Sequence, residues 1–221
     1  MQVFLDLDGP ILDVSNRYYA IYTDLLEEAG YTPLHISEYW AHKRNRLPET
    51  KILARTCPRP FVAAYTKKRL GLIEESRYLK MDTLQPGVAQ LIAQWAKDHN
   101  LYLVTLRNNR DALLRELSYL GIRKYFLKVL SESDNDGSWR VKYRLVSPVA
   151  DDAKRSIMVG DTEADVEAGR AVGLTTVAVT CGIRSRALLM EAKPDYVFED
   201  MRGIHLEELI LRPQSDTVTY L

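Results

Sequence analysis

The feature that most constrains this chain is one short apolar run at its beginning, far from every other strand signal. Val3–Leu5 ends at Asp6 and is followed by the turn-forming pair Gly9–Pro10, which predicts a buried strand. Residues 14–80 then show helical spacing and no strong strand signal. The first strand must therefore pair with segments much later in the chain, and the fold must accommodate a large insertion.

From residue 81 onward, strand and helix signals alternate. The strand signals are the apolar runs 101–105, 126–130, 157–159, 176–179 and 196–198. Apolar helical faces lie between them, and Gly121 and Gly173 are placed to end two of these helices. The alternation predicts an α/β fold with a doubly wound parallel sheet and helices on both of its faces.

These two observations divide the chain into two domains. Residues 1–13 and 81–221 are predicted to form the α/β core, and residues 14–80 an inserted helical domain. The inserted segment carries 12 Lys+Arg and 7 Asp+Glu, whereas the whole chain has 30 of each. Its basic excess either reflects solvated helix faces or helps to attract an anionic ligand. The polar tail after Arg212 is expected to fray.

Composition and charge narrow the class of protein. The 221 residues have a formal net charge of zero, which gives no support for nucleic-acid binding. No run of apolar residues is long enough to span a membrane. The beginning of the chain lacks a basic, apolar leader, so we expect a cytoplasmic protein in which Cys57 and Cys181 are reduced thiols. Either a monomer or a homodimer is compatible with the sequence.

Polar side chains follow three of the expected strands. Asp6 and Asp8 follow the first, Thr105 follows the second, and Asp161 and Asp165 follow a later one. Singly, an Asp at a strand end often caps a helix, and a Thr there is often strand material. In a doubly wound sheet, however, these positions converge on the edge where ligands bind. Crowded carboxylates repel one another unless a cation lies between them, and hard oxygen ligands suit Mg²⁺.

Three segments resemble the sequence motifs of the haloacid dehalogenase-like hydrolase superfamily. Phe4–Asp13 is similar to the first motif, Leu103–Thr105 to the second, and Val159–Asp165 to the Gly-Asp-x-x-x-Asp motif, with similarity continuing to Leu174. The second motif is weak by itself, but the first and last together are specific. The layout is most similar to the phosphoglycolate phosphatase-like branch, which implies a Rossmann-like core and a helical cap formed by residues 14–80.

The resemblance implies a role for each of the converging residues. Asp6 would be the nucleophile that forms an aspartyl-phosphate. Asp8 would protonate the leaving oxygen and then activate water, and Thr105 would donate a hydrogen bond to the phosphoryl group. Mg²⁺ would be held by Asp6, the backbone carbonyl of Asp8 and Asp161, with Asp165 as a direct or water-mediated ligand.

The resemblance also calls for a lysine that neutralises the phosphoryl group. Lys142 is favoured, because it lies at the expected start of the helix that precedes the strand at 157–159. Lys128 lies within a strand candidate, and Lys154 lies just before a strand, at the opposite end of the sheet. For any of them, the alternative is an ordinary surface lysine.

The chain departs from the family pattern at two places. Pro10 stands where relatives most often have Thr or Val, and it removes one backbone N–H. Arg107 and Asn108 stand close after Thr105, where they either reach the substrate phosphate or begin the next helix. In the inserted segment, the basic stretch His42–Arg46 either faces the site or forms a solvated loop.

The presence of Asp8 favours one reaction over others. A general acid is needed to expel an alkoxide from a phosphate ester, and dehalogenases and phosphonatases of this family lack an Asp at this position. We therefore expect a Mg²⁺-dependent phosphatase acting on a small phosphorylated metabolite. A phosphomutase of the same family is the alternative enzyme. A non-catalytic phosphate- or partner-binding protein would be expected to have lost Asp6, Asp8 or Asp161, and the inserted segment argues against a phosphoacceptor signalling domain.

Overall fold

The structure is a computed structural model that describes residues 1–133, 135–211 and 219–220 of the chain, so the tail expected to fray lies largely outside the described residues. The chain divides into two compact units. Met1–Asp13 and Leu84–Leu221 form one, called the core unit here, and Val14–Thr83 form the inserted unit. The chain passes between them at two short strands that pair with each other, β2 (Leu12–Asp13) and β3 (Thr83–Leu84).

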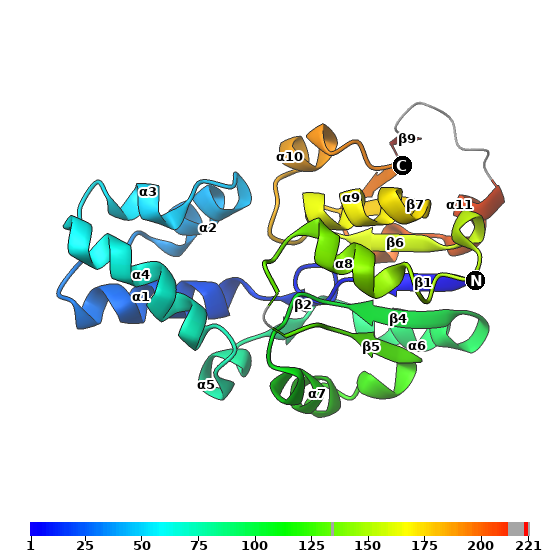
Figure 1. The fold of residues 1–221 in the computed structure, drawn as a ribbon, viewed down its shortest axis with the longest axis horizontal. Coiled ribbons are helices and arrows are strands. Elements are labelled where there is room, and N and C mark those ends of the chain that lie inside the picture. The colour runs from blue at the N-terminus through cyan, green and yellow to red at the C-terminus, as the bar shows by residue number, and fades with distance from the viewer. Residues whose placement is uncertain (134, 212–218, 221) are drawn as a thin grey trace. The chain divides into compact units, whose positions relative to one another are not determined.

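The core unit is built on a seven-stranded parallel sheet of order β5-β4-β1-β6-β7-β8-β9 (Figure 1). Its strands are β1 Gln2–Leu5, β4 Asn100–Val104, β5 Lys128–Leu130, β6 Ile157–Gly160, β7 Thr175–Val179, β8 Tyr196–Phe198 and β9 Thr219–Tyr220. Every residue of β1 is buried, as expected for a strand covered on both faces. Val3 pairs with Leu101 on one side and Ile157 on the other, so β1 lies between β4 and β6. The predicted doubly wound parallel sheet is confirmed.

Helices cover both faces of this sheet. The helices of the core unit are α6 Val88–Asp98, α7 Arg110–Tyr119, α8 Trp139–Val146, α9 Glu163–Val172, α10 Arg186–Glu191 and α11 Leu206–Leu211, with 3₁₀ turns η1 Arg123–Tyr125, η2 Ala153–Arg155 and η3 Met201–Gly203. Figure 1 shows α8 and α9 in front of the sheet and α6 behind it. Val146 of α8 and Ala168 of α9 pack with Phe4 and Met158 of the strands. None of the helices in the described part of the chain combines the length and apolar character needed to cross a bilayer.

The boundaries of α9 have a clear local cause. At its first turn, the Asp165 carboxylate accepts hydrogen bonds from the backbone and hydroxyl of Thr162, in the manner of a capping box. At its end, Gly173 adopts a left-handed conformation with φ of 88°. The sequence predicted that Gly173 would end this helix, as it does. The same Asp165 also serves the site described below, so the cap fixes a functional side chain.

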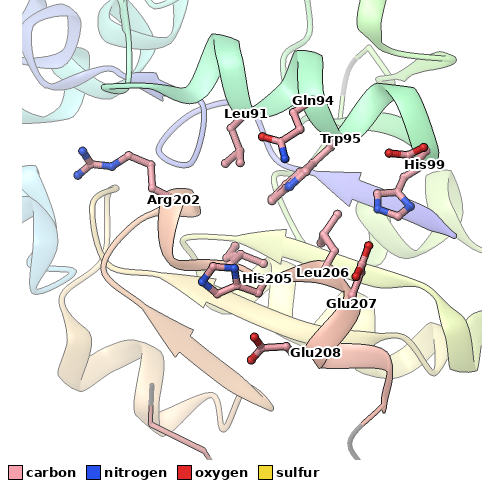
Figure 2. Close-up of a pocket in the computed structure, with 11 residues that line it drawn as sticks. Leu91, Gln94, Trp95, His99, Arg202, His205, Leu206, Glu207 and Glu208 are labelled. Carbon is pink, nitrogen blue, oxygen red and sulfur yellow. The ribbon is translucent and has the colours of Figure 1, made fainter.

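A groove of about 420 Å³ lies between α6, η3 and α11 (Figure 2). Trp95, His99 and His205 line it together with Arg202. The Arg202 guanidinium is already paired with Asp200, with 2.6 Å between Nη2 and Oδ2. None of the polar residues at the strand ends lines this groove.

The inserted unit is helical and has a core rich in tyrosine. Its helices are α1 Ser15–Glu28, α2 Ile36–Arg44, α3 Glu49–Leu53, α4 Arg59–Leu72 and α5 Ser76–Leu79. Tyr22 of α1 and Tyr39 of α2 stack with their ring centroids 4.5 Å apart. Such offset aromatic pairs add about 1 kcal/mol beyond the area they bury. The unit therefore has a hydrophobic core of its own, which also includes the free thiol of Cys57.

One buried carboxylate ties this core together. Glu49, only 9% exposed, accepts hydrogen bonds from the hydroxyls of Tyr39 at 2.9 Å and Tyr65 at 2.8 Å. Its oxygens also lie 2.8 Å from Lys43 Nζ and 3.3 Å from Arg69 Nε. Burial alone would raise the pKa of Glu49, but the two cations outweigh it and lower the pKa to about 2. Glu49 is therefore ionised and fully partnered.

Replacing Glu49 should destabilise the inserted unit in a pH-dependent way. Because the folded-state pKa is depressed, the stabilisation is present above the ordinary pKa of 4.5 and is lost as the pH falls towards 2. We expect Glu49→Gln to lower the free energy of unfolding by about 3 kcal/mol at pH 7, and by much less at pH 3. Urea unfolding at both pH values measures this, with Glu28→Gln on the exposed face of α1 as the control. An equal loss at both pH values would contradict it.

Candidate active site

Three polar residues lie directly after three adjacent strands, at the same edge of the sheet. Asp6 follows β1, Thr105 follows β4 and Asp161 follows β6, and β1 lies between the other two strands. Sheet-like hydrogen bonds continue one residue past the strands, since Asp6 N–H donates to the Val159 carbonyl at 3.0 Å. The Thr105 N–H likewise donates to a carbonyl of β5. The backbone at this edge is therefore fixed, and all three side chains are buried.

Lys142 of α8 reaches into this edge. Its Nζ lies 2.8 Å from Asp6 Oδ1 and 2.5 Å from Asp165 Oδ1, and the residue is 2% exposed. Burial alone would lower the pKa of Lys142, but the carboxylates of Asp165 and Asp6 raise it, so the ammonium stays charged. The other candidate lysines lie elsewhere: Lys128 is exposed at the start of edge strand β5, and Lys154 is exposed in η2.

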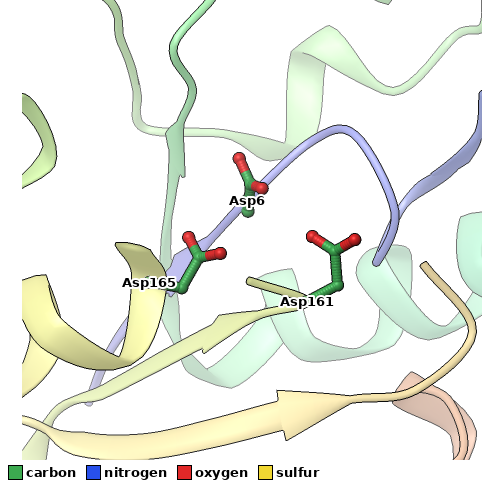
Figure 3. Close-up of side chains that lie close together, drawn as sticks. All are labelled: Asp6, Asp161 and Asp165. Carbon is green, nitrogen blue, oxygen red and sulfur yellow. The ribbon is translucent and has the colours of Figure 1, made fainter. Parts of the chain in front are cut away.

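Asp6 shares one side of the site with two further carboxylates. Figure 3 shows Asp6, Asp161 and Asp165 around a common space, and one oxygen from each lies within 4.8 Å of the others. Burial and the charges of Asp165 and Asp8 raise the pKa of Asp6 to about 7, although Lys142 acts in the opposite direction. The site therefore has more negative charge than Lys142 can balance.

Asp161 is the carboxylate whose surroundings best fit a cation. It is fully buried, and its Oδ2 accepts a hydrogen bond from the Ile183 N–H at 2.5 Å. Its Oδ1 is buried and has no hydrogen-bond partner among the described residues. Burial and repulsion from Asp6 and Asp165 raise its pKa. A buried, unpaired acceptor next to other carboxylates fits a hard divalent cation.

Two glycines leave room around this carboxylate. A Cβ at either Gly9 or Gly182 would collide with the Asp161 side chain. Gly9 also has φ of 111°, a conformation that residues with a side chain rarely adopt. The Pro10 that follows it sits in a turn closed by the Gly9 N–H, which donates to the Leu12 carbonyl at 2.8 Å. The missing N–H of Pro10 is thus not needed to close this turn.

Asp165 is already engaged by the protein through both oxygens. Oδ1 faces Lys142, and Oδ2 accepts from the Thr162 hydroxyl at 2.7 Å and from its N–H at 3.1 Å. These contacts favour an orienting role for Asp165, and they leave Asp6 and Asp161 as the carboxylates best placed to bind a metal ion directly. The donor set is all oxygen, which suits Mg²⁺.

The structure joins Asp8 to Arg107, a link that sequence reasoning missed. Arg107 donates to both oxygens of Asp8, from Nε to Oδ2 at 2.9 Å and from Nη2 to Oδ1 at 2.6 Å. The pairing of the two strands explains the contact. Leu5 of β1 pairs with Leu103 of β4, and Asp8 and Arg107 each follow these paired residues by a few positions. Asn108 instead accepts hydrogen bonds from the backbone and side chain of Asn135.

Comparison with known proteins identifies the family of this chain. The family model of haloacid dehalogenase-like hydrolases matches residues 3–179. The chain belongs to this family. A phosphoglycolate phosphatase of Synechococcus elongatus is 30% identical over 197 residues, which are 89% of this chain and 92% of that protein. The pyrophosphatase PpaX of Bacillus pumilus is 27% identical over 98 residues, 43% of this chain and 45% of that one. The predicted family, its phosphoglycolate phosphatase-like branch and the enzyme class of a phosphatase are confirmed.

Solved structures share the fold of this haloacid dehalogenase-like hydrolase. A family member from Streptococcus pneumoniae has a TM-score of 0.74 at 18% identity and covers 95% of this chain and 96% of its own. A hydrolase of the same superfamily from Geobacter sulfurreducens has a TM-score of 0.69 at 17% identity and covers 95% of both chains. At these identities the likeness concerns the fold.

Because the carboxylates repel one another, we expect Asp161→Asn to change the free energy of unfolding in opposite directions with and without a metal ion. Because the pKa values of Asp6 and Asp161 are raised, ionising both costs stability, and this cost grows as the pH rises from about 4 to about 7. In EDTA at pH 7.5, Asp161→Asn should therefore raise the free energy of unfolding above that of the wild type, because it removes one of the repelling charges. Added Mg²⁺ should stabilise the wild type and leave Asp161→Asn nearly unchanged.

Thermal unfolding with and without Mg²⁺ measures both effects. Glu167→Gln, on the exposed face of α9, is the matched control, because it removes one charge outside the site and should keep the full response to Mg²⁺. An Asp161→Asn protein that responds to Mg²⁺ as the wild type does would exclude Asp161 as a ligand.

Proposed function

We propose that this hydrolase is a Mg²⁺-dependent phosphatase that acts on a small phosphorylated metabolite through an aspartyl-phosphate on Asp6. The observation that carries the proposal is the position of Lys142, which bonds to Asp6 and Asp165. These lie close to Asp161, whose Oδ1 finds no hydrogen-bond partner in the described part of the chain. A buried ammonium and a cation-binding carboxylate on either side of a nucleophile suit a dianionic phosphoryl group. Phosphoryl transfer depends mainly on such positioning and charge neutralisation.

The first chemical step forms the aspartyl-phosphate. A carboxylate oxygen of Asp6 attacks the phosphorus as the bond to the leaving oxygen breaks, and Asp8 gives its proton to that oxygen. The Thr105 hydroxyl, which accepts from the Arg107 N–H at 3.3 Å, retains its own proton to donate to a phosphoryl oxygen. The Lys142 ammonium compensates the charge that Asp6 and the phosphoryl group share.

The second step regenerates the enzyme. Asp8 accepts a proton from water as the water oxygen attacks the phosphorus, and the bond between phosphorus and Asp6 breaks. Inorganic phosphate leaves, and Asp6 is a free carboxylate again. The residues that would hold Mg²⁺ are Asp6, Asp161 and the backbone carbonyl of Asp8, with Asp165 acting through Lys142 or a water molecule. When bound, the ion supplies further charge neutralisation for the phosphoryl group.

The inserted unit is proposed to be the cap that recognises the rest of the substrate. A cap of this kind excludes water from the site and contacts the leaving group. Residues 14–80 carry an excess of basic side chains, and the stretch His42–Arg46 belongs to it. The relatives named as phosphoglycolate phosphatase and pyrophosphatase make small, highly anionic phosphate compounds the first substrates to test. The active form is proposed to be a cytoplasmic monomer or homodimer.

Turnover should depend on both Asp6 and the metal ion. We expect the wild type with Mg²⁺ to release phosphate from phosphoglycolate or from pyrophosphate, and EDTA to abolish this activity. Asp6→Asn should lower kcat at least about 1,000-fold, because the amide cannot act as the nucleophile. Lys142→Met should also lower kcat strongly, whereas Lys128→Met, at the exposed start of β5, is the matched control and should not.

The covalent intermediate gives an independent test. Protein quenched in acid during turnover should carry one added phosphoryl group on the peptide that contains Asp6, as seen by mass spectrometry. The adduct should be absent from Asp6→Asn. Turnover that persists in Asp6→Asn, or an adduct on another residue, would contradict the proposed mechanism. Transfer of phosphate within a sugar phosphate, without release, would favour the phosphomutase alternative.

A further inference from the structure

We propose that Arg107 is the positioning residue for Asp8, and that Glu116 holds Arg107 in place for this task. The inference rests on the proposed function, because it concerns the residue to which that mechanism gives the proton transfers. It identifies a chain of three charged side chains that leads from α7 through the loop after β4 to the loop after β1. Arg107 is not thereby a phosphate ligand.

The contact between Arg107 and Asp8 is specific in its geometry. Nε and Nη2 of Arg107 each lie within 3 Å of a different oxygen of Asp8, which is the two-pronged pairing that a planar guanidinium forms with a carboxylate. Such a pairing fixes both the position and the plane of the carboxyl group, and each oxygen keeps a second lone pair that can hold the transferred proton. A single hydrogen bond, or a lysine ammonium, would leave the carboxylate free to rotate.

The other edge of the Arg107 guanidinium faces a carboxylate of helix α7. Nη1 of Arg107 lies 3.4 Å from Oε2 of Glu116, in the middle of α7. The side chains of Arg107 and Glu116 are 5% and 6% exposed, whereas that of Asp8 is 18% exposed. Asp8, the most exposed of the three, is thus the one that must meet a substrate, and the two buried residues connect it to a regular helix.

Asp8 needs such support because of where it lies. It follows the strand by three residues and stands in the turn that Leu7 and Leu12 close with a hydrogen bond at 3.0 Å. Asp6, in contrast, is fixed by sheet pairing and by Lys142. Loop side chains gain the geometric precision that catalysis needs from rigid neighbours.

The proposal predicts that the effect of losing Arg107 depends on the leaving group. An alkyl phosphate needs a positioned acid to expel its alkoxide, whereas acetyl phosphate has a leaving group stable enough to depart without one. With Mg²⁺ present, Arg107→Met should lower kcat/KM for an alkyl phosphomonoester that the wild type hydrolyses by about 100-fold. It should lower kcat/KM for acetyl phosphate less than about five-fold, because Asp6, Thr105 and Lys142 are intact.

A double-substitution cycle provides the second readout. If Arg107 acts only through Asp8, Asp8→Asn combined with Arg107→Met should be no slower on the alkyl ester than Asp8→Asn alone. Arg107→Lys should recover part of the loss, since it restores the charge but not the two-pronged contact. Glu116→Gln should have a smaller effect with the same leaving-group pattern. Arg110→Met is the matched control, because Arg110 bonds to Val129 and Ser131 of the β5 region.

Each other outcome would overturn the inference. Equal losses on both substrates, with weaker inhibition by inorganic phosphate, would make Arg107 a phosphate ligand. Multiplying losses in the double variant, or loss of folding in both Arg107 variants by circular dichroism, would make its role structural. A wild type that hydrolyses both substrates, with an Arg107→Met protein of equal activity, would refute the inference and leave the phosphatase intact. A wild type that hydrolyses neither substrate would refute the proposed function, and the inference with it.

Discussion

The buried ammonium of Lys142 is the interaction on which the site depends. It is the cation bonded to both Asp6 and Asp165, and these two carboxylates share their space with the fully buried Asp161. Charges of one sign, removed from water, cannot remain ionised together without partners. Lys142 offsets part of this repulsion. Burial and the remaining repulsion raise the pKa of Asp6, and Oδ1 of Asp161 has no hydrogen-bond partner within the residues that the structure describes. The site is therefore built to accept positive charge.

A second buried charge cluster shows the opposite balance. In the inserted unit, Glu49 is surrounded by Lys43, Arg69 and two tyrosine hydroxyls, and its pKa falls to about 2. Every oxygen of that carboxylate has a partner within the unit, so it has no need of a ligand. The contrast separates two uses of buried charge. A satisfied carboxylate fixes the packing of helices, whereas an unsatisfied one marks a place where chemistry can occur.

The sheet brings these groups together through its strand order. With β1 between β4 and β6, the residues after these strands become neighbours although about 100 and 155 positions separate them along the chain. Lys142 reaches the site from helix α8, which packs on one face of the sheet. Asp165 lies in the first turn of α9, where it also caps that helix. Each side chain is thus held by a regular element or by sheet pairing. Asp8 is the exception, which is why its contact with Arg107 matters.

Much of this was readable in the sequence, because local patterns carry it. The apolar runs predicted the bounds of β8, Gly173 predicted the end of α9, and the places of Asp6, Asp161 and Asp165 after two strands indicated one acidic edge. The strand expected at 126–130 begins only at Lys128, after the 3₁₀ turn η1, and the two-residue strand β9 was not foreseen. Such short edge elements depend on a neighbour more than on their own residues.

The sequence by itself determined the parallel α/β core, the insertion of a helical segment after the first strand and the residue types of the site. Only the tertiary structure decided which lysine reaches Asp6 and that both oxygens of Asp165 bond to other groups of the protein. It also decided that the side chain of Arg107 contacts Asp8 and Glu116. The physical reason is that periodicity records which face of an element is buried. The partner of a long charged side chain depends instead on distances between elements that are remote in the chain.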